Sequence, residues 1–287
     1  MSDKTAENLE PQFFQFLKTN NLEKKSILLC GFEKSGNTWV RLIIYNYFNI
    51  ISNGADRTLT FEELNRFQNH IIYLKNPINF IEEQPSPVDF EGGVAPFKPG
   101  FPIFYRTHDP YPPDSPHFGK IIYIYRNPLD TLISNYYFWK NHKEPFYPIP
   151  VGLRPKFTDI NYFVLHYSNI WARFYQLTVE KCQIAISYEQ MKEDPLATFT
   201  DLFINLGLDP NMDALKRSIA FSSFSNIKQM MNQTGQTYGN ANPEKFLGNF
   251  LRSGDSGQYV QELKPFTIKK SREILITNGV PAAIANS

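Results

Sequence analysis

The sequence has few cysteines, almost no net charge and no long apolar run. Among 287 residues only Cys30 and Cys182 are cysteines, too few for a disulfide framework or a cysteine-rich zinc site. No stretch approaches the roughly 18 consecutive apolar residues of a membrane span. Residues 1–10 are polar and charged, unlike a secretory signal peptide. We therefore expect a soluble, cytoplasmic protein.

The charge balance also limits the possible partners. Lys and Arg number 29 against 28 Asp and Glu, which gives a net charge of +1. A chain so close to neutral offers no overall attraction to nucleic acid or to an anionic membrane. We expect neither as a partner, and we expect any bound anion to be held by a local site.

Aromatic residues, in contrast, are abundant. The chain has 25 Phe, 16 Tyr and 3 Trp, together 15% of its residues, and 21 Pro. Most of these rings belong in a core, for which a 42% hydrophobic content is ample. Some are expected to line a binding cavity, because small-molecule pockets are mostly apolar and aromatic.

Short apolar runs followed by helical patterns organise the chain. Three strand–helix pairs are predicted: 26–31 with 36–51, 120–125 with 127–140, and 183–187 with 190–206. The run 102–105 adds another strand. This alternation predicts an α/β fold, a single domain over 1–287 with a central parallel sheet and helices on both faces. Ligands of such sheets bind beyond the carboxyl ends of the strands.

The segment after the first strand has the composition of an anion-binding loop. Lys34 supplies a charge, Gly36 lets the backbone approach a ligand, and Ser35 and Thr38 add hydroxyl donors. It is not a Walker A loop, in which the Lys follows the second Gly. Taken alone, the segment is also compatible with a tight turn that carries a solvated Lys.

Three further motifs, taken with this loop, point to one family. The motifs are Lys34-Ser35-Gly36-Asn37-Thr38-Trp39, Arg106-Thr107-His108, Arg126 with Ser134 eight residues later, and Phe-Leu-Arg-Ser-Gly-Asp-Ser-Gly at 250–257. In this order, over about 26–266, they resemble PAPS-dependent sulfotransferases of the soluble, cytosolic type. The resemblance implies a P-loop-like sulfotransferase fold, with 3′-phosphoadenosine 5′-phosphosulfate (PAPS) as sulfuryl donor, 3′-phosphoadenosine 5′-phosphate (PAP) as product, and no metal.

The resemblance also assigns nucleotide contacts. The loop residues from Lys34 to Thr38 would bind the 5′-phosphate, and Trp39 and Phe224 would enclose the adenine, with Tyr188 and Ser222 at its edge. Residues expected at the 3′-phosphate are Arg126, Ser134, Arg252, Ser253 and Gly254. Arg126 and Ser134 suit that role on physical grounds, because they lie just past a strand and two helical turns further on.

For catalysis, His108 is the candidate general base, and Lys34 would neutralise charge on the departing nucleotide. The acceptor is expected to be a small molecule with a hydroxyl or amine, such as a natural product or alkaloid. Stretches 76–102 and 139–155 would form its entrance. The residues expected around it are Phe80, Phe101, Arg106, Tyr136, Phe138, His142 and Phe146.

Departures from the family pattern indicate a divergent, bacterial member. Glu33 stands beside the anion-binding loop, at a position where the family usually has Pro, and its side chain is expected to point away from the bound phosphate. Ser253 replaces a Lys of the family pattern. The family's dimer motif is not evident after Phe266, which leaves a monomer or a homodimer open. Two other functions also stay open: a P-loop kinase of a nucleoside or small metabolite, and a nucleotide-binding protein without catalysis.

Overall fold

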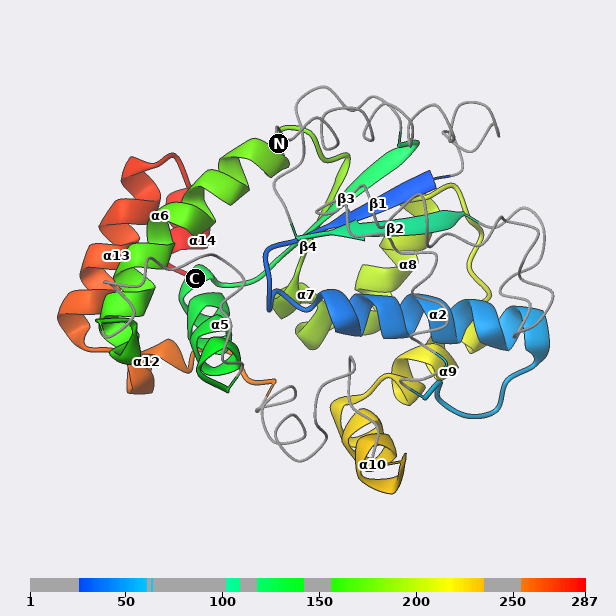
Figure 1. The fold of residues 1–287 in the computed structure, drawn as a ribbon. Helices are drawn as coiled ribbons and strands as arrows, with labels where there is room; N and C mark the ends of the chain where they lie inside the picture. The colour runs from blue at the N-terminus through cyan, green and yellow to red at the C-terminus, as the bar shows by residue number, and fades with distance from the viewer. Residues whose placement is uncertain (1–25, 61–62, 64–101, 109–117, 142–155, 235–253) are drawn as a thin grey trace, which may run out of the picture.

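The computed structural model describes residues 26–60, 63, 102–108, 118–141, 156–234 and 254–287. Within these ranges four strands form one parallel sheet in the order β2-β1-β3-β4 (Figure 1). The strands are β1 (Ser26–Cys30), β2 (Ile103–Thr107), β3 (Lys120–Tyr125) and β4 (Ile184–Ser187). The parallel sheet and its flanking helices confirm the expected α/β class.

Alternating side chains of the strands face two separate cores. In β1, Leu28 and Cys30 point into one core, and Ile27 and Leu29 point into the other. All four side chains are at most 4% exposed. The sheet is therefore buried on both faces, as its continuous apolar strands require.

Helices cover both faces, as predicted (Figure 1). The core containing Leu28 is closed by α5 (Pro128–Asn141), α6 (Ile160–Val179), α12 (Tyr259–Glu262), α13 (Pro265–Thr277) and α14 (Ala282–Ala285). The core containing Ile27 is closed by α2 (Asn37–Asn53), α7 (Tyr188–Glu193), α8 (Pro195–Asn205), α9 (Met212–Phe221) and α10 (Phe224–Thr234).

One predicted helix was wrong. The stretch 190–206 is not continuous but belongs to α7 and α8, which are separated at Asp194. Pro195 disfavours helical geometry at the residue before it, and Asp194 is accordingly non-helical, with φ −140° and ψ 83°. The Asp194 side chain instead caps α8 by accepting from the Ala197 N–H.

Other boundaries moved by one or two residues. The predicted strand 102–105 runs from Ile103 to Thr107, and the predicted helix 127–140 runs from Pro128 to Asn141. Helix α10 ends at Thr234. Residues 76–101, 142–155 and 235–252 lie outside the described residues.

The order of the strands creates a binding crevice. β1 and β3 are neighbours in the sheet, but the helix after β1 covers one face and the helix after β3 covers the other. Where successive connections leave adjacent parallel strands in opposite directions, the strand ends open a crevice. The fold therefore places a site where β1 and β3 end.

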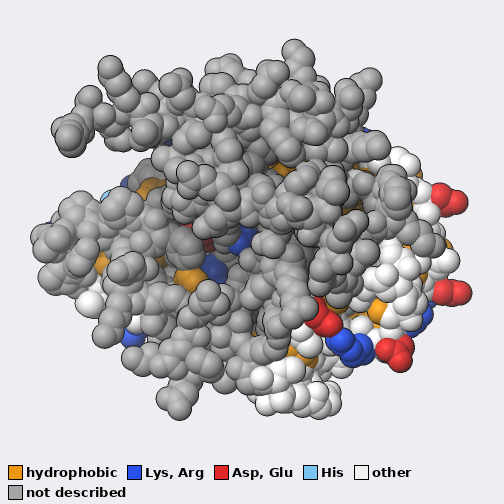
Figure 2. Space-filling model, turned by 45° about the vertical axis from the view of Figure 1, so that its right-hand side comes forward, with side chains coloured by type: hydrophobic (Ala, Val, Ile, Leu, Met, Phe, Trp, Pro, Cys, Tyr) orange, Lys and Arg blue, Asp and Glu red, His pale blue; other side chains and the backbone are white. Residues whose placement is uncertain are grey.

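The described surface carries charges of both signs. Acidic and basic side chains lie side by side along the part of the face visible in Figure 2, in keeping with the near-zero net charge. In the ranges that the structure describes, no helix has the length and apolar character that crossing a bilayer requires.

Candidate active site

A cavity of about 590 Å³ occupies this crevice. Residues after each strand line it: Lys34 follows β1, His108 follows β2, Arg126 follows β3 and Tyr188 follows β4. The expected site residues in the lining are Lys34, Gly36, Asn37, Thr38, Trp39, Arg106, His108, Arg126, Ser134, Phe138, Tyr188, Ser222, Phe224 and Gly254. Segments more than 200 residues apart in sequence thus meet in one site.

The loop after β1 enters α2 through two residues with positive φ, Lys34 at 69° and Gly36 at 101°. Gly36 is the N-cap of α2, and glycine has no side chain that could occupy the first N–H groups of the helix. A Cβ at Gly36 would lie 2.8 Å from Cδ2 of Tyr188, so both strain and contact exclude a larger residue. The positive end of a 17-residue helix is therefore presented at the cavity wall, where it suits an anion.

Two polar side chains of this loop behave differently. The Asn37 amide donates to the Phe32 carbonyl at 3.1 Å and so fixes the turn. The Ser35 hydroxyl is fully buried, and its Oγ has no hydrogen-bond partner among the described residues. A buried hydroxyl without a partner is costly, but Ser35 does not line the cavity, so the N–H groups at the start of α2 are what this loop offers an anion. The loop therefore fits a phosphate group.

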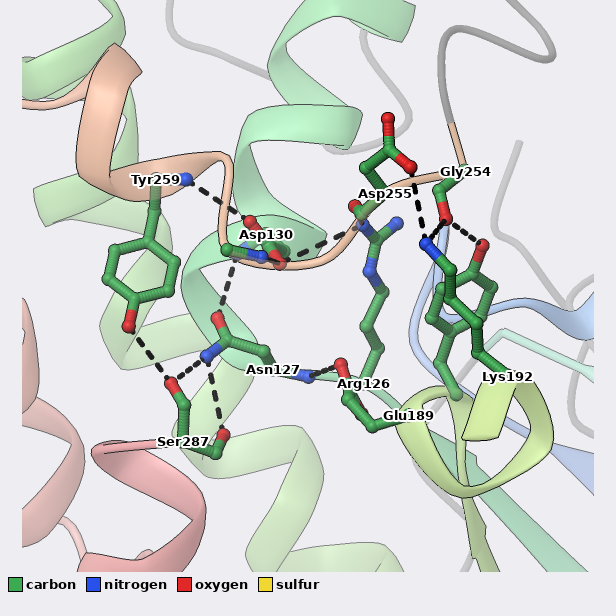
Figure 3. Close-up of polar contacts among 11 residues, drawn as sticks. Arg126, Asn127, Asp130, Glu189, Lys192, Gly254, Asp255, Tyr259 and Ser287 are labelled. Carbon is green, nitrogen blue, oxygen red and sulfur yellow. Dashed lines mark hydrogen bonds and ion pairs between the residues drawn. The ribbon is translucent and has the colours of Figure 1, made fainter. Parts of the chain in front are cut away.

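Arg126 also lines the cavity and is 7% exposed. Its Nη2 donates to the Asp255 carbonyl at 2.6 Å, and its Cζ lies 4.5 Å from the ring centroid of Tyr188 (Figure 3). Its Nε is buried without a hydrogen-bond partner among the described residues. The guanidinium thus retains donor capacity for an anion, next to Ser134 of the same wall.

Asp130 fixes the C-terminal loop that closes this side. Its carboxylate accepts from the Gly257 N–H at 2.6 Å and the Tyr259 N–H at 3.2 Å (Figure 3). It also lies 3.8 Å from Nη2 of Arg126. Because the Asp130 side chain is completely buried, these contacts tie the loop to the start of α5. Gly254 and Asp255 are thereby held over Arg126.

Aromatic rings make up the part of the cavity between α2 and α7. The rings of Trp39 and Tyr188 lie 5.6 Å apart between centroids, and Phe224 is 37% exposed. The buried Ser222 hydroxyl accepts from the Asn46 amide at 3.0 Å, which leaves its proton to be donated. Flat apolar walls with a few polar groups at the edge suit a purine ring.

Burial raises the pKa of Tyr188. Its hydroxyl therefore stays protonated at neutral pH, and it donates to the Gly254 carbonyl at 2.7 Å. The ring consequently contacts both the α2 loop and the C-terminal loop. Tyr188 therefore connects the loop before α2 with the C-terminal loop.

His108 follows β2 and is half-buried at the cavity wall. Its Nδ1 lies 2.7 Å from the Gly31 carbonyl oxygen. A carbonyl can only accept, so Nδ1 carries the proton and Nε2 of the neutral ring has the basic lone pair. Local structure thus selects the tautomer of His108.

Lys34 and Phe138, which line the same cavity, contact each other. The Lys34 Nζ is 4.5 Å from the Phe138 ring centroid, a distance typical of a cation–π contact. Arg106, at the end of β2, lines the same cavity and is 3% exposed. An imidazole, two cations and an aromatic ring therefore line one cavity.

Tyr136 is placed differently from its neighbours on α5. It is 4% exposed, does not contribute to the described cavity lining, and its hydroxyl donates to the Thr158 carbonyl at 2.6 Å. The remaining expected residues lie outside the described residues: Phe80, Phe101, His142, Phe146, Arg252 and Ser253.

Several lining residues did not emerge as site residues from the sequence, among them Glu33 and Lys192. Glu33 does not point away as expected: it is 3% exposed, lines the cavity, and its Oε2 accepts from the Asn135 amide at 3.3 Å. Lys192 lines the cavity from α7. It lies four residues after Tyr188, a helical spacing that places the two on one face and was the available signal.

A match to a family model identifies the family of this chain. The family model described as a sulfotransferase domain matches residues 24–277. The chain belongs to the sulfotransferase domain family. The motifs from Lys34 to Gly254 lie within the matched part.

Curated relatives agree with this assignment. Mouse sulfotransferase 1 family member D1 is 23% identical over 268 residues, covering 86% of this chain and 81% of the relative. Rat sulfotransferase 1C2 is 25% identical over 259 residues, covering 85% and 79%. Arabidopsis thaliana cytosolic sulfotransferase 15 is 23% identical over 270 residues, covering 86% and 70%.

Solved structures share the fold of this sulfotransferase. The mouse sulfotransferase SULT7A1, crystallised with PAP, has a TM-score of 0.56 at 19% identity and covers 93% of this chain and 91% of its own. Retinol dehydratase, crystallised with androsterone and PAP, has a TM-score of 0.55 at 15% identity and covers 92% and 84%. The predicted sulfotransferase fold is confirmed.

Proposed function

We propose that this sulfotransferase moves the sulfuryl group of PAPS to a hydroxyl or amine of a small-molecule acceptor and releases PAP. The observation that carries the proposal is that His108 and Lys34 lie in one cavity with the loop before α2 and with Arg126. A general base, a cation for the leaving phosphate and two anion sites are what such a transfer needs.

The described residues fit the nucleotide in three parts. The 5′-phosphate takes the N-terminal end of α2, where the N-cap Gly36 has no side chain to occupy the first N–H groups. The adenine takes the space beside Trp39 and Phe224, and the 3′-phosphate takes Arg126. The complexes of SULT7A1 and retinol dehydratase with PAP support this choice of nucleotide.

His108 prepares the acceptor for attack. Its Nδ1–H is held by the Gly31 carbonyl, so Nε2 accepts the proton of the acceptor hydroxyl or amine. The imidazolium that forms stays hydrogen-bonded to that carbonyl, which keeps the ring oriented. PAPS itself supplies the sulfuryl group, whose transfer is an in-line displacement.

Lys34 stabilises the leaving nucleotide. It is three residues before the first turn of α2, so its ammonium and the helix N–H groups act on the same phosphate. Negative charge grows on the phosphate oxygen that separates from sulfur, and a fixed cation lowers the energy of that state. The contact with Phe138 holds Lys34 on the acceptor side of the cavity.

The acceptor space combines an apolar wall with an acidic group. Phe138 supplies the flat wall, and the buried Glu33 carboxylate lies beside Lys34 and is fixed by Asn135. A buried carboxylate favours a ligand that carries a positive charge. We infer an acceptor with an aromatic or aliphatic body and an ammonium group separate from the nucleophilic atom, as in many alkaloids.

A transfer screen tests the proposed function. The full chain is incubated with PAPS labelled in the sulfuryl group and with panels of phenols, alcohols, amino alcohols and amines, and labelled products are measured. Label in an organic product, together with PAP release, is the expected result. Phosphoryl transfer from ATP and Mg²⁺ with no sulfuryl transfer would favour the kinase alternative. Nucleotide binding without transfer to any acceptor class would favour a non-catalytic protein.

A further inference from the structure

Two basic side chains from different elements converge on one short segment of the C-terminal loop. Arg126, after β3, donates to the Asp255 carbonyl at 2.6 Å. Lys192, on α7, donates to the Gly254 carbonyl at 3.0 Å and pairs with the Asp255 carboxylate at 3.2 Å (Figure 3). Four of the residues in this cluster, including both cations, line the cavity: Arg126, Lys192, Gly254 and Asp255.

Helix α7 places Lys192 where it can serve the same ligand as Tyr188. The two residues are four apart, so they lie on one face of the helix, and both donate to the Gly254 carbonyl. That face is turned toward Arg126, whose guanidinium covers the Tyr188 ring. Lys192 therefore belongs to the Arg126 side of the cavity and not to the Lys34 side.

The electrostatics of this cluster favour an anion between the two cations. Like charges held near one another repel, and a negative group between them lowers the energy of both. Here that group consists of two carbonyl oxygens and the Asp255 carboxylate. A phosphate dianion offers more charge and more acceptor oxygens than these groups do.

The contact between Lys192 and Asp255 can be exchanged at little cost. The two side chains are 43% and 66% exposed, and ion pairs so exposed are weak because water screens them. Arg126, in contrast, is held by the buried Asp130 and keeps its position. Lys192 is consequently the mobile cation of the pair, and Arg126 is the fixed one.

We propose that Lys192 is a second cation for the terminal 3′-phosphate of the nucleotide, beside Arg126, and that Asp255 holds the Lys192 ammonium when no nucleotide is bound. This inference rests on the proposed function and assigns a further residue to its donor site. Nucleotide binding transfers Lys192 from the Asp255 carboxylate to the phosphate. No covalent bond is made or broken in this exchange.

Calorimetric titration with PAP and with 5′-AMP, which lacks the 3′-phosphate, tests the assignment. In Lys192→Met the PAP affinity is expected to fall about tenfold to hundredfold, as for the loss of one charge-assisted hydrogen bond. The 5′-AMP affinity stays within about twofold, because only the 3′-phosphate contact is lost. Lys216→Met, on the exposed surface of α9, is the matched control and keeps both affinities.

A variant of Asp255 should change the PAP affinity in the opposite direction. Asp255→Asn removes the competing charge and is expected to tighten PAP binding about twofold to fivefold with 5′-AMP unchanged. Equal losses of PAP and 5′-AMP affinity in Lys192→Met, or unchanged PAP affinity, would overturn the assignment. Weaker PAP binding in Asp255→Asn would overturn the exchange. If the wild-type protein bound PAP no better than 5′-AMP, the proposed function itself would fail.

Discussion

The Nδ1 atom of His108 donates to the carbonyl oxygen of Gly31 across 2.7 Å. Gly31 directly follows β1 and begins the loop that leads into α2, and His108 directly follows β2. The two strands are paired in register up to Cys30 and Thr107, so this hydrogen bond continues the sheet. The candidate base is thus oriented by the same loop that we propose receives the nucleotide phosphate.

Replacing His108 by Ala should remove transfer and leave nucleotide binding intact. Loss of a general base typically lowers the rate about 10²-fold to 10⁴-fold. PAP affinity should change by less than about twofold, because the expected phosphate contacts come from other residues. Turnover of PAPS and calorimetric titration with PAP measure the two effects.

His166→Ala is the matched control for that variant. His166 lies on α6, outside the described cavity lining. The centroid of its ring is 5.0 Å from that of the Phe157 ring. It should keep full activity. Loss of both turnover and PAP binding in His108→Ala would mean that His108 only maintains the structure of the loop.

Replacing Lys34 by Met should lower turnover more than binding. The expected fall in kcat is about 10²-fold to 10³-fold, because the cation acts mainly on charge that develops during transfer. Methionine keeps the length of the stem and is no better suited than lysine to a φ of 69°, so backbone strain is unchanged. Steady-state kinetics separate kcat from KM. An unchanged kcat with a raised KM would show that Lys34 only binds the nucleotide.

Replacing Gly36 by Ala should damage the nucleotide site beyond its effect on stability. An alanine there must adopt a φ of 101° and would place its Cβ 2.8 Å from the Tyr188 ring. Gly54→Ala is a matched control, because φ at Gly54 is also positive, 67°, and a Cβ there meets no atom within 4 Å.

Both glycine variants should lose about 1–2 kcal/mol of unfolding free energy from left-handed strain. Only Gly36→Ala should also lose PAP affinity, by about tenfold or more, since Tyr188 must move. Denaturant unfolding and PAP titration of both variants make the comparison. Equal PAP affinities in the two variants would contradict the close packing of Tyr188 on the loop.

Replacing Glu33 by Gln should change acceptor preference. Glutamine retains an oxygen that can accept from the Asn135 amide, so the side chain stays in place while its charge is removed. KM for amino-alcohol acceptors should rise about tenfold, and KM for neutral phenols should change by less than about twofold. Similar changes for both acceptor classes would argue against a cationic acceptor.

Much of the scaffold was predictable because strands and loops carry local signals. The run Lys120–Tyr125 was predicted with its observed bounds, since five consecutive aliphatic or aromatic residues between Lys120 and Arg126 leave little ambiguity. The loop between β1 and α2 was predictable from two residues. Gly36 permits the positive φ with which the loop enters α2, and Lys34 brings a positive charge to it. The helix break at Asp194 was missed although Pro195 signalled it.

The side-chain environment of the site was harder to predict. Ser134 and Phe138, four residues apart, share the cavity face of α5, whereas Tyr136 lies between them and turns toward α6. This periodicity separates Tyr136 from the site. The burial of Glu33, however, depends on Asn135, about a hundred residues away in the chain, and local sequence does not reveal such a contact.

The most direct test of the central claim is a side-by-side calorimetric titration of the full chain with PAP, with PAPS and with ATP plus Mg²⁺. The account predicts saturable, one-site binding of PAP and PAPS and at least about a hundredfold weaker binding of ATP, because ATP lacks the 3′-phosphate proposed to bind Arg126. Equal or tighter binding of ATP would contradict it.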